Sequence, residues 1–226
     1  RTARSALGKN DYDYFGTEIT IDFHNILFRP NIISNCACSV KIIGTRSVDT
    51  AIPFGTGIVD GYCYLLLNHL PLAVHGDWYL AGQRIAHLHN HTSEEGYGFQ
   101  HTTYCGTTAL NNQWHSSWAD FFVRQRLEPL FKALEAKGEK FTRASVTAEK
   151  CYDMLSGHQP APALLHGDLW SGNIGFVPDL ESSRTVVFDP ASYFGDAEAD
   201  LAMTELFGRF PQAFYMGYQK YHDIPA

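Results

Sequence analysis

Hydrophobic positions in the first third of the chain follow the period of two that is typical of β-strands. Ile19, Ile21 and Phe23 alternate with polar neighbours, and two further runs are rich in β-branched and aromatic residues. The predicted strands are residues 19–23, 38–43 and 62–67. The Gly55–Gly57 segment precedes the last of them and no helix follows it, so we expect a hairpin turn there rather than a phosphate-binding loop.

The rest of the chain carries the helical period of about 3.6 residues. Trp78, Ala81, Ile85 and Leu88 recur on one face of a first helix, which also carries three histidines at positions 87, 89 and 91. A second helix begins at Trp118, and Pro129 is expected to end or kink it. Further helices are predicted near residues 142–155, 200–207 and 213–221. The order of elements predicts an α+β protein with a small β-rich N-terminal part and a larger helical C-terminal part.

The strongest chemical signal is the segment His166–Asn173, H-G-D-L-W-S-G-N, followed by Phe188-Asp189-Pro190. Asn173 follows Asp168 by five positions, as Asn follows Asp in the catalytic loop of protein kinases. Asp189 follows a short hydrophobic run, as the metal-binding aspartate of a kinase follows a strand. We expect Asp168 to be the general base, and Asn173 and Asp189 to hold Mg²⁺, which prefers oxygen ligands.

A His-Gly-Asp triplet also occurs in ordinary turns and in metallophosphoesterases. Metallophosphoesterases carry a downstream Gly-Asn-His, whereas Gly172-Asn173 is followed here by Ile174. The Asn and the second Asp at kinase spacing therefore favour a kinase.

These segments closely resemble the fructosamine kinase (ketosamine-3-kinase) family. The matching segments are residues 96–99, 110–114, 118–127, 164–173 and 188–208, and the resemblance extends over about residues 52–221. Trp170, inside the H-G-D-L-W-S-G-N loop, distinguishes this family from aminoglycoside phosphotransferases and choline kinases, which share the fold.

The resemblance implies a protein-kinase-like two-lobe fold. The small N-lobe would span residues 1–67, the hinge 68–70 and the larger, mainly helical C-lobe 71–226. It also implies ATP and Mg²⁺ as cofactors, with adenine bound by the hinge residues Asn68, His69 and Leu70.

The implied activity is ATP-dependent phosphorylation of the 3-hydroxyl of ketosamines. These are fructosamine or ribulosamine adducts on lysines, so glycated proteins or free ketosamines would be the substrates and recovery of the lysine the result. Trp170 and Trp114 would form a platform for the sugar, whereas Trp118 is expected to pack in the core. His166 and Asp200 would support the catalytic loop, Asp200 by accepting backbone N–H bonds from residues 166–168.

The first fifty residues match the family poorly. Lys41 is the lysine expected on a strand, where it would bind the α- and β-phosphates of ATP. Ten residues separate Lys41 from Ile52, too few for the helix that carries the usual partner Glu, and Glu18 precedes Lys41. The family also continues with further helices, so we expect an abbreviated or divergent N-lobe. Two alternatives therefore stay open: a pseudokinase-like nucleotide- or sugar-binding module, and another small-molecule kinase of the same fold.

Composition limits the partners and the location. A net charge of −7 argues against a nucleic-acid partner, and no run approaches the roughly 18 apolar residues of a membrane helix. Five scattered cysteines favour reduced thiols and an intracellular, cytoplasmic protein, while the basic start, Arg1–Ala6, leaves organelle targeting open. No pattern in the chain defines an oligomeric state.

Overall fold

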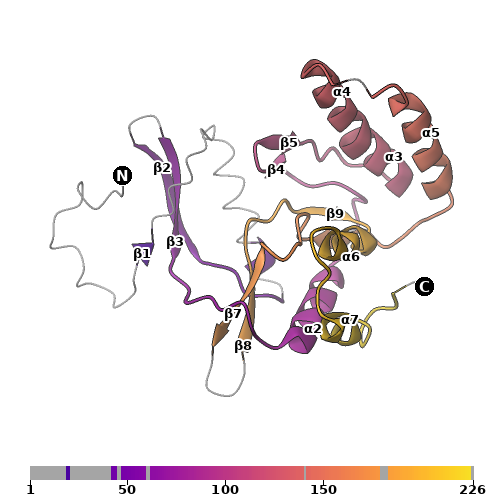
Figure 1. Ribbon diagram of the computed structural model, residues 1–226. Helices are drawn as coiled ribbons and strands as arrows, with labels where there is room; N and C mark the ends of the chain where they lie inside the picture. Colours follow the sequence, from indigo (N-terminus) through magenta and orange to yellow (C-terminus); the bar gives the residue numbers. More distant parts are fainter. Residues whose placement is uncertain are drawn as a thin grey trace.

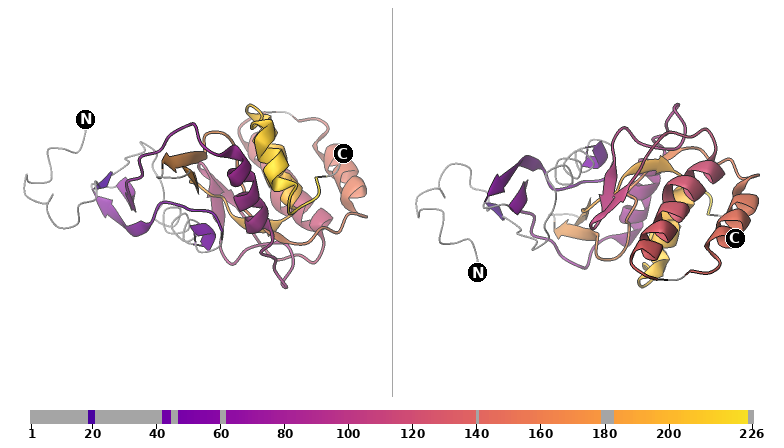
Figure 2. Two further views of the ribbon diagram at one scale, coloured as in Figure 1. Left: turned by 90° about the horizontal axis from the view of Figure 1, so that it is seen from below. Right: turned by 90° about the horizontal axis from the view of Figure 1, so that it is seen from above.

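The computed structural model describes residues 19–20, 42–44, 47–59, 62–139, 141–178 and 183–224. In these ranges, α-helices are mixed with small antiparallel sheets (Figure 1). A three-stranded sheet lies at one end of the molecule and the helices of residues 118–155 at the other, an arrangement visible from three directions (Figures 1 and 2). No helix within the described ranges is long and apolar enough to cross a bilayer.

The three-stranded sheet has the order β1-β3-β2, formed by β1 (Ile19–Thr20), β2 (Pro53–Val59) and β3 (Tyr62–Asn68). The strand predicted over 62–67 is confirmed. The turn expected at Gly55–Gly57 is wrong, because these residues lie inside β2. Gly57 pairs with Tyr64, and a Cβ at Gly57 would lie 2.4 Å from the Tyr64 hydroxyl oxygen. The glycine therefore makes room for a cross-strand aromatic side chain.

Residues 42–44 are helical, so the strand expected over residues 38–43 is wrong at Ile42 and Ile43. Ile43 is fully buried in the hydrophobic core together with Val48. A short apolar run has the same composition in a buried strand and in a buried helix, so periodicity alone did not separate them. Lys41 itself, with the remainder of this run, lies outside the described residues.

Helices α2 (Trp78–His89) and α7 (Gln212–Tyr218) pack against each other through two glycines. A Cβ at Gly82 would lie 1.9 Å from the Phe214 carbonyl oxygen, and one at Gly217 would lie 1.9 Å from the Tyr79 carbonyl oxygen. The two backbones therefore approach more closely than any residue other than glycine allows. The predicted helix at residues 78–88 is confirmed, and Asp77 caps it by accepting a hydrogen bond from Leu80 N.

A continuous helical run forms the far end of the molecule. It consists of α3 (Trp118–Phe122), the π-helix η2 (Val123–Leu127) and α4 (Glu128–Ala136), against which α5 (Ala144–Leu155) packs. Pro129 does not end the run. It stands in the first turn of α4, where its missing N–H is tolerated, and the break in helical geometry is the π-helix directly before it.

Short strand pairs bring the two sequence motifs together. Strand β6 (Ala163–Leu165) pairs with β9 (Tyr193–Gly195), and β7 (Ile174–Pro178) pairs with β8 (Ser183–Val187), all antiparallel. The loop from β6 to β7 carries residues 166–173, and the loop from β8 to β9 carries residues 188–192. Because both ends of one loop are paired with both ends of the other, the two loops lie side by side. Helix α6 (Ala197–Leu206) follows, and the hairpin β4 (Thr103–Cys105)–β5 (Thr108–Leu110) precedes them in the chain.

Candidate active site

His166 joins the two loops. Its ring is fully buried, and burial lowers the pKa of its imidazole, so the ring is neutral. Nε2 donates to the Phe188 carbonyl oxygen at 3.0 Å, and Nδ1 accepts from the Asp168 backbone N–H at 3.2 Å. The His166 carbonyl in turn accepts from Ala191 N at 2.9 Å. One side chain thus fixes Asp168 and the residue before Asp189 relative to each other.

Gly167 has a conformation that other residues rarely adopt. Its φ is +83°, and a Cβ at this position would lie 2.3 Å from the Ala191 carbonyl oxygen. Both the left-handed backbone and the close approach of the second loop require glycine here. The glycine of H-G-D is therefore explained by the packing of the two loops.

Asp168 and Asn173 are directly hydrogen-bonded. Nδ2 of Asn173 donates to the Asp168 carbonyl oxygen at 2.9 Å and to Asp168 Oδ2 at 3.0 Å. Burial raises the pKa of the Asp168 carboxyl, an effect that His166 and Asn173 oppose and that the charges of Asp189 and Asp200 reinforce. Because Nδ2 of Asn173 faces Asp168, the amide Oδ1 is the atom that could ligate a cation.

Asp189 is the only non-glycine residue with positive φ, +52°, among the described residues. It is exposed at the end of β8, and Asp tolerates the left-handed region better than most residues. Strained backbone of this kind occurs preferentially at functional sites. The charge of Asp189 acts on Asp168, so two carboxylates and the Asn173 amide gather in one region. This all-oxygen donor set fits Mg²⁺.

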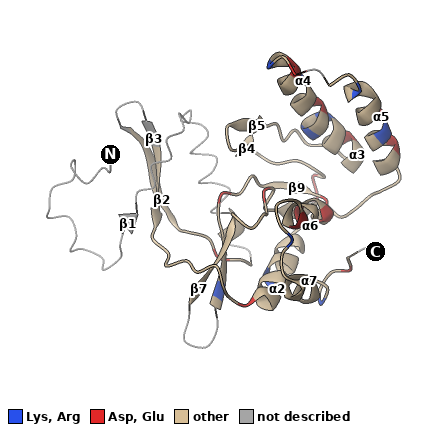
Figure 3. Ribbon diagram, in the orientation of Figure 1, with Lys and Arg blue, Asp and Glu red and all other residues tan. Residues whose placement is uncertain are grey.

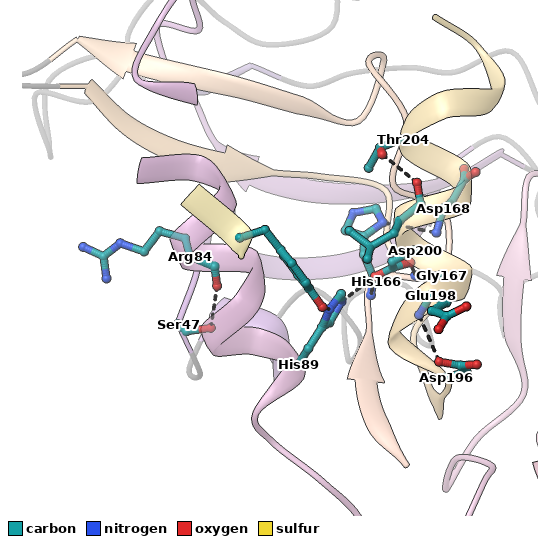
Figure 4. Close-up of polar contacts among 12 residues, drawn as sticks. Ser47, Arg84, His89, His166, Gly167, Asp168, Asp196, Glu198, Asp200 and Thr204 are labelled. Carbon is teal, nitrogen blue, oxygen red and sulfur yellow. Dashed lines mark hydrogen bonds and ion pairs between the residues drawn. The ribbon is translucent and has the colours of Figure 1, made fainter. Parts of the chain in front are cut away.

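Asp200, at the first turn of α6, is buried against the loop of residues 166–173 (Figure 4). Oδ2 accepts from His166 N at 2.7 Å, and Oδ1 accepts from Gly167 N at 2.9 Å. These are the backbone contacts that the sequence led us to expect. Burial alone would raise the pKa of Asp200, but hydrogen bonds from His89 and from the loop hold it below its ordinary value. Asp200 is therefore an ionised acceptor within the core.

The two candidate sugar-binding tryptophans have different surroundings. Trp170 is half-buried; its ring lies over Gly172 and meets Phe207 edge-on, with centroids 5.6 Å apart. Trp114 is also half-buried and stacks on Phe194 of β9 at 6.1 Å. The ring contacts found in the described part of the chain do not join one indole to the other. Trp118 is buried in the core, as expected.

The π-helix η2 anchors the segment that carries Trp114, a role that the sequence did not reveal. Gln125 Nε2 lies 2.9 Å from His115 Nε2. The buried Arg126 donates to the Asn111 carbonyl oxygen at 2.8 Å and to Asn112 Oδ1 at 2.5 Å. The segment is therefore held on both sides of Trp114. The amphipathic pattern gave no sign that two successive polar side chains would turn inward here.

The β4–β5 hairpin is a further neighbour of the site. Thr103 donates to the Ala191 carbonyl oxygen at 3.4 Å, which joins β4 to the loop after β8. Burial raises the pKa of the Cys105 thiol, and the charge of Asp168 raises it further, so the tip of the hairpin lies within electrostatic range of Asp168. The sequence offered no motif for this hairpin.

The expected hinge connects the three-stranded sheet to the segment before α2. The Asn68 N–H donates to the Ile52 carbonyl oxygen at 3.1 Å, and Asn68 Oδ1 accepts from Ile52 N, so Asn68 is occupied within the sheet. Its N–H is not available to adenine. Within the described residues of the sheet itself none is charged (Figure 3).

The contacts of two buried residues, His89 and Tyr218, were not predicted from the sequence. The helical pattern alone assigned no contact to the histidines at and after the end of α2. Instead, His89 faces inward and its Nε2 lies 3.2 Å from Asp200 Oδ2 (Figure 4). The Leu88–His89 pair at the end of a predicted amphipathic helix was the available signal, because the histidine continues the buried face.

In the site, the buried His166 joins two loops, the half-buried Asp168 is hydrogen-bonded to Asn173, and Asp189 lies on the adjoining loop. This combination is that of a kinase. A family model of fructosamine kinase matches residues 37–226, and the chain belongs to this family.

Known proteins of the family match most of this chain. A Synechocystis protein named "Probable ketoamine kinase" is 42% identical over 176 residues, which cover 77% of this chain and 59% of the relative. The chain thus spans 59% of the length of that relative. The crystal structure of a Haemophilus somnus protein assigned as a fructosamine-3-kinase superposes with a TM-score of 0.82 at 29% identity, covering 87% of this chain and 66% of the other.

A second crystal structure, of a Thermobifida fusca protein similarly assigned, shares the fold with a TM-score of 0.71. Its identity is 22%, and the match covers 91% of this chain and 79% of the other. The mixed helix and strand architecture is therefore that of this structural group.

Proposed function

We propose that this protein phosphorylates the 3-hydroxyl of ketosamines, fructosamine or ribulosamine adducts on lysines, with ATP as the donor. The observation that carries the proposal is the hydrogen-bonded pair of Asp168 and Asn173, tied by His166 to the loop that bears Asp189. Membership of the fructosamine kinase family supports the choice of acceptor. Glycated proteins or free ketosamines are the proposed substrates, and recovery of the lysine is the proposed outcome.

In this mechanism Asp168 accepts the proton of the attacking hydroxyl. Its burial favours this role, because a raised pKa makes a carboxylate a better proton acceptor. Asn173 and Asp189 would hold Mg²⁺, which neutralises charge on the ATP phosphates. Trp170 would stack on the C–H face of the sugar beside Asp168, with Trp114 as a second candidate surface.

We place the nucleotide between the two ends of the molecule, in a protein-kinase-like arrangement of two lobes. Residues 1–67 would form the N-lobe and residues 71–226 the C-lobe. The hinge residues Asn68, His69 and Leu70 are the proposed adenine contacts, although the Asn68 N–H already donates to the Ile52 carbonyl oxygen. Lys41 is the proposed phosphate lysine.

A nucleotide- or sugar-binding module without turnover is the second candidate. The described residues of β1, β2 and β3 carry no Lys or Arg, so a phosphate contact from this sheet would depend on Lys41, and a chain in which Lys41 does not make that contact would bind without turnover. The retained Asp168, Asn173 and Asp189 favour the enzyme.

The test is transfer of labelled phosphate from Mg-ATP to a lysine peptide carrying ribulosamine or fructosamine. Asp168→Asn keeps the size of the side chain but removes the base, so we expect the rate to fall by about 10²–10⁴-fold. Nucleotide binding should be largely unchanged. Asp153→Asn, which neutralises an exposed carboxylate on α5, serves as the matched control and should retain full activity.

Each outcome selects a function. Full activity in Asp168→Asn would contradict the assignment of the base. Mg-ATP binding without transfer by the unmutated chain would support the binding module. Transfer to an aminoglycoside or choline-like alcohol, but not to a ketosamine, would identify a different small-molecule kinase.

A further inference from the structure

We propose that Tyr218 on α7 is a positioning residue for the catalytic loop, acting through His89 and Asp200. Its hydroxyl would set the orientation of the His89 ring, and His89 would in turn hold the Asp200 carboxylate against the backbone of the loop. The kinetic part of this proposal rests on the proposed function. Its structural part does not.

The four groups form one chain of hydrogen bonds. The Tyr218 hydroxyl lies 2.8 Å from His89 Nδ1, and His89 Nε2 lies 3.2 Å from Asp200 Oδ2. The same Oδ2 accepts from His166 N at 2.7 Å. The three side chains come from α7, α2 and α6, and each is no more than 1% exposed. Bulk water therefore does not compete for these hydrogen bonds.

The direction of the hydrogen bond between His89 and Asp200 follows from the chemistry of the carboxylate. Asp200 is held ionised and can only accept, so the His89 Nε2 that faces it carries the hydrogen. The other ring nitrogen, Nδ1, then faces the Tyr218 hydroxyl, which can either donate to it or accept from it. Burial, followed by nearby carboxylate charge, raises the pKa of Tyr218, so its hydroxyl stays protonated. Tyr218 is therefore placed to hold the His89 ring in the orientation in which Nε2 faces Asp200.

The position of Tyr218 is fixed by backbone packing. The glycine contacts of Gly82 and Gly217 hold α7 directly against α2, and the ideal Cβ of Gly82 would lie 2.7 Å from Tyr218 N. The Tyr218 ring lies between Phe214, at 6.4 Å, and His222, at 5.4 Å between centroids. With the backbone and ring both restrained, the hydroxyl has little freedom to leave Nδ1.

Tyr215 provides a matched control on the same helix. It is also buried, and its hydroxyl lies 2.9 Å from Thr204 Oγ1, which has a second partner in the Leu201 carbonyl oxygen. Tyr215→Phe thus removes the same group, a phenolic hydroxyl, from the same helix. It leaves intact the hydrogen bonds that link Tyr218 to the catalytic loop. A purely structural role for Tyr218 predicts that the two variants behave alike.

The kinetic experiment compares Tyr218→Phe with Tyr215→Phe in ketosamine phosphorylation. We expect Tyr218→Phe to lower kcat by roughly three- to ten-fold with little change in KM, the size expected when one buried hydrogen bond that holds the catalytic geometry is lost. Tyr215→Phe should keep kcat within about twofold, on the general expectation for a change distant from the reacting groups. His89→Gln, whose amide can still donate to Asp200, should retain more activity than His89→Leu. Equal kcat values for the two tyrosine variants would overturn the proposal.

A second readout does not depend on kinase activity. The N–H groups of His166 and Gly167 donate hydrogen bonds to Asp200. Their amide exchange therefore reports directly on the Asp200 end of the hydrogen-bond series. We expect Tyr218→Phe, but not Tyr215→Phe, to accelerate their exchange at matched global stability. Unchanged exchange in Tyr218→Phe would overturn the proposal even if the chain is active. Faster exchange in an inactive chain would support it while contradicting the proposed function.

Discussion

Asp200 is a buried carboxylate, and in the part of the chain that the structure describes no Lys or Arg is paired with it. A carboxylate in the core costs several kcal/mol unless its oxygens are satisfied, and here two backbone N–H groups and His89 satisfy them. Two of these partners belong to the catalytic loop. The stability of the core and the geometry of the site therefore depend on the same carboxylate.

Asp200→Asn should destabilise the protein by about 3 kcal/mol at neutral pH, because an amide replaces one acceptor oxygen with a donor inside the core. The folded-state pKa of Asp200 lies below its ordinary value of 3.8. Its contribution to stability is therefore fully present above that value and is lost as the pH falls through the folded pKa. The difference in unfolding free energy between the two proteins should shrink below about pH 4, as measured by urea unfolding over a pH series.

The control for this measurement is Asp153→Asn, in which the carboxyl removed is exposed on α5. Removing this exposed carboxyl should change the unfolding free energy at neutral pH by no more than about 0.5 kcal/mol. A difference between Asp200→Asn and the parent that is constant from pH 7 to low pH would contradict the assignment of an ionised Asp200.

At the residue scale the spacing of the motif predicted which residues the structure brings together. Asp168 and Asn173 are in contact and Asp189 lies on the adjoining loop, while their roles in kinase chemistry stay predictions. The contacts of His89 and Tyr218 could not be predicted, because they join residues 111 and 129 positions apart. Such a chain of hydrogen bonds has no local spacing to recognise.

At the scale of elements, periodicity predicted the helices better than the strands. The helix at residues 78–88 was clear because its apolar positions recur over three turns. The glycines of β2 resembled a turn because only the paired strand reveals that Tyr64 needs the space above Gly57. The π-helix was not predicted, since its single-turn change in geometry leaves no distinct pattern of apolar residues.

The pairing of α2 and α7 yields the prediction at this scale. In Gly82→Ala the added Cβ would lie 1.9 Å from the Phe214 carbonyl oxygen, so the helices must separate. We expect a loss of about 1–3 kcal/mol in unfolding free energy, even though alanine favours a helix over glycine. Chemical denaturation would measure it.

Gly157→Ala is the comparison for this substitution. No neighbouring atom of the described chain lies within 4 Å of the place that the added methyl group would take, and the φ of Gly157 is ordinary. The effect of this substitution should be small, within about 0.5 kcal/mol. An equally stable Gly82→Ala protein would show that α2 and α7 are not closely packed in solution.

At the scale of the whole molecule, the core and the three-stranded sheet are distinct. The described residues between Val48 and Ala81 contribute none of the members of the buried hydrophobic cluster. The sheet instead exposes large apolar side chains, including Phe54 and Ile58, each 57% exposed. The sheet therefore depends far less on the core than β6 does, whose three residues are all buried.

Amide hydrogen exchange should divide the molecule accordingly. We expect the amides of β2 and β3 to exchange faster than those of β6 and β7, because little apolar burial opposes local opening of the sheet. If nucleotide binds at the proposed hinge, saturating Mg-ATP should slow exchange in β3 and at residues 69–70 and leave α5 unaffected. Uniform protection across the sheet and the core would contradict this division.

The order in which the chain is made gives the Tyr218–His89–Asp200 contacts a further consequence. The ribosome releases α2 first, then the catalytic loop, then α6, and α7 after it. When His166 and Gly167 emerge from the ribosome, Asp200, whose carboxylate accepts hydrogen bonds from their N–H groups, is more than thirty residues further along the chain. Domains fold largely as units during translation. A nascent chain can therefore contain every residue of the kinase motif before the loop that carries the motif has its final conformation. If Tyr218 positions the loop as proposed, residues 166–173 reach their final geometry only when α7 closes against α2.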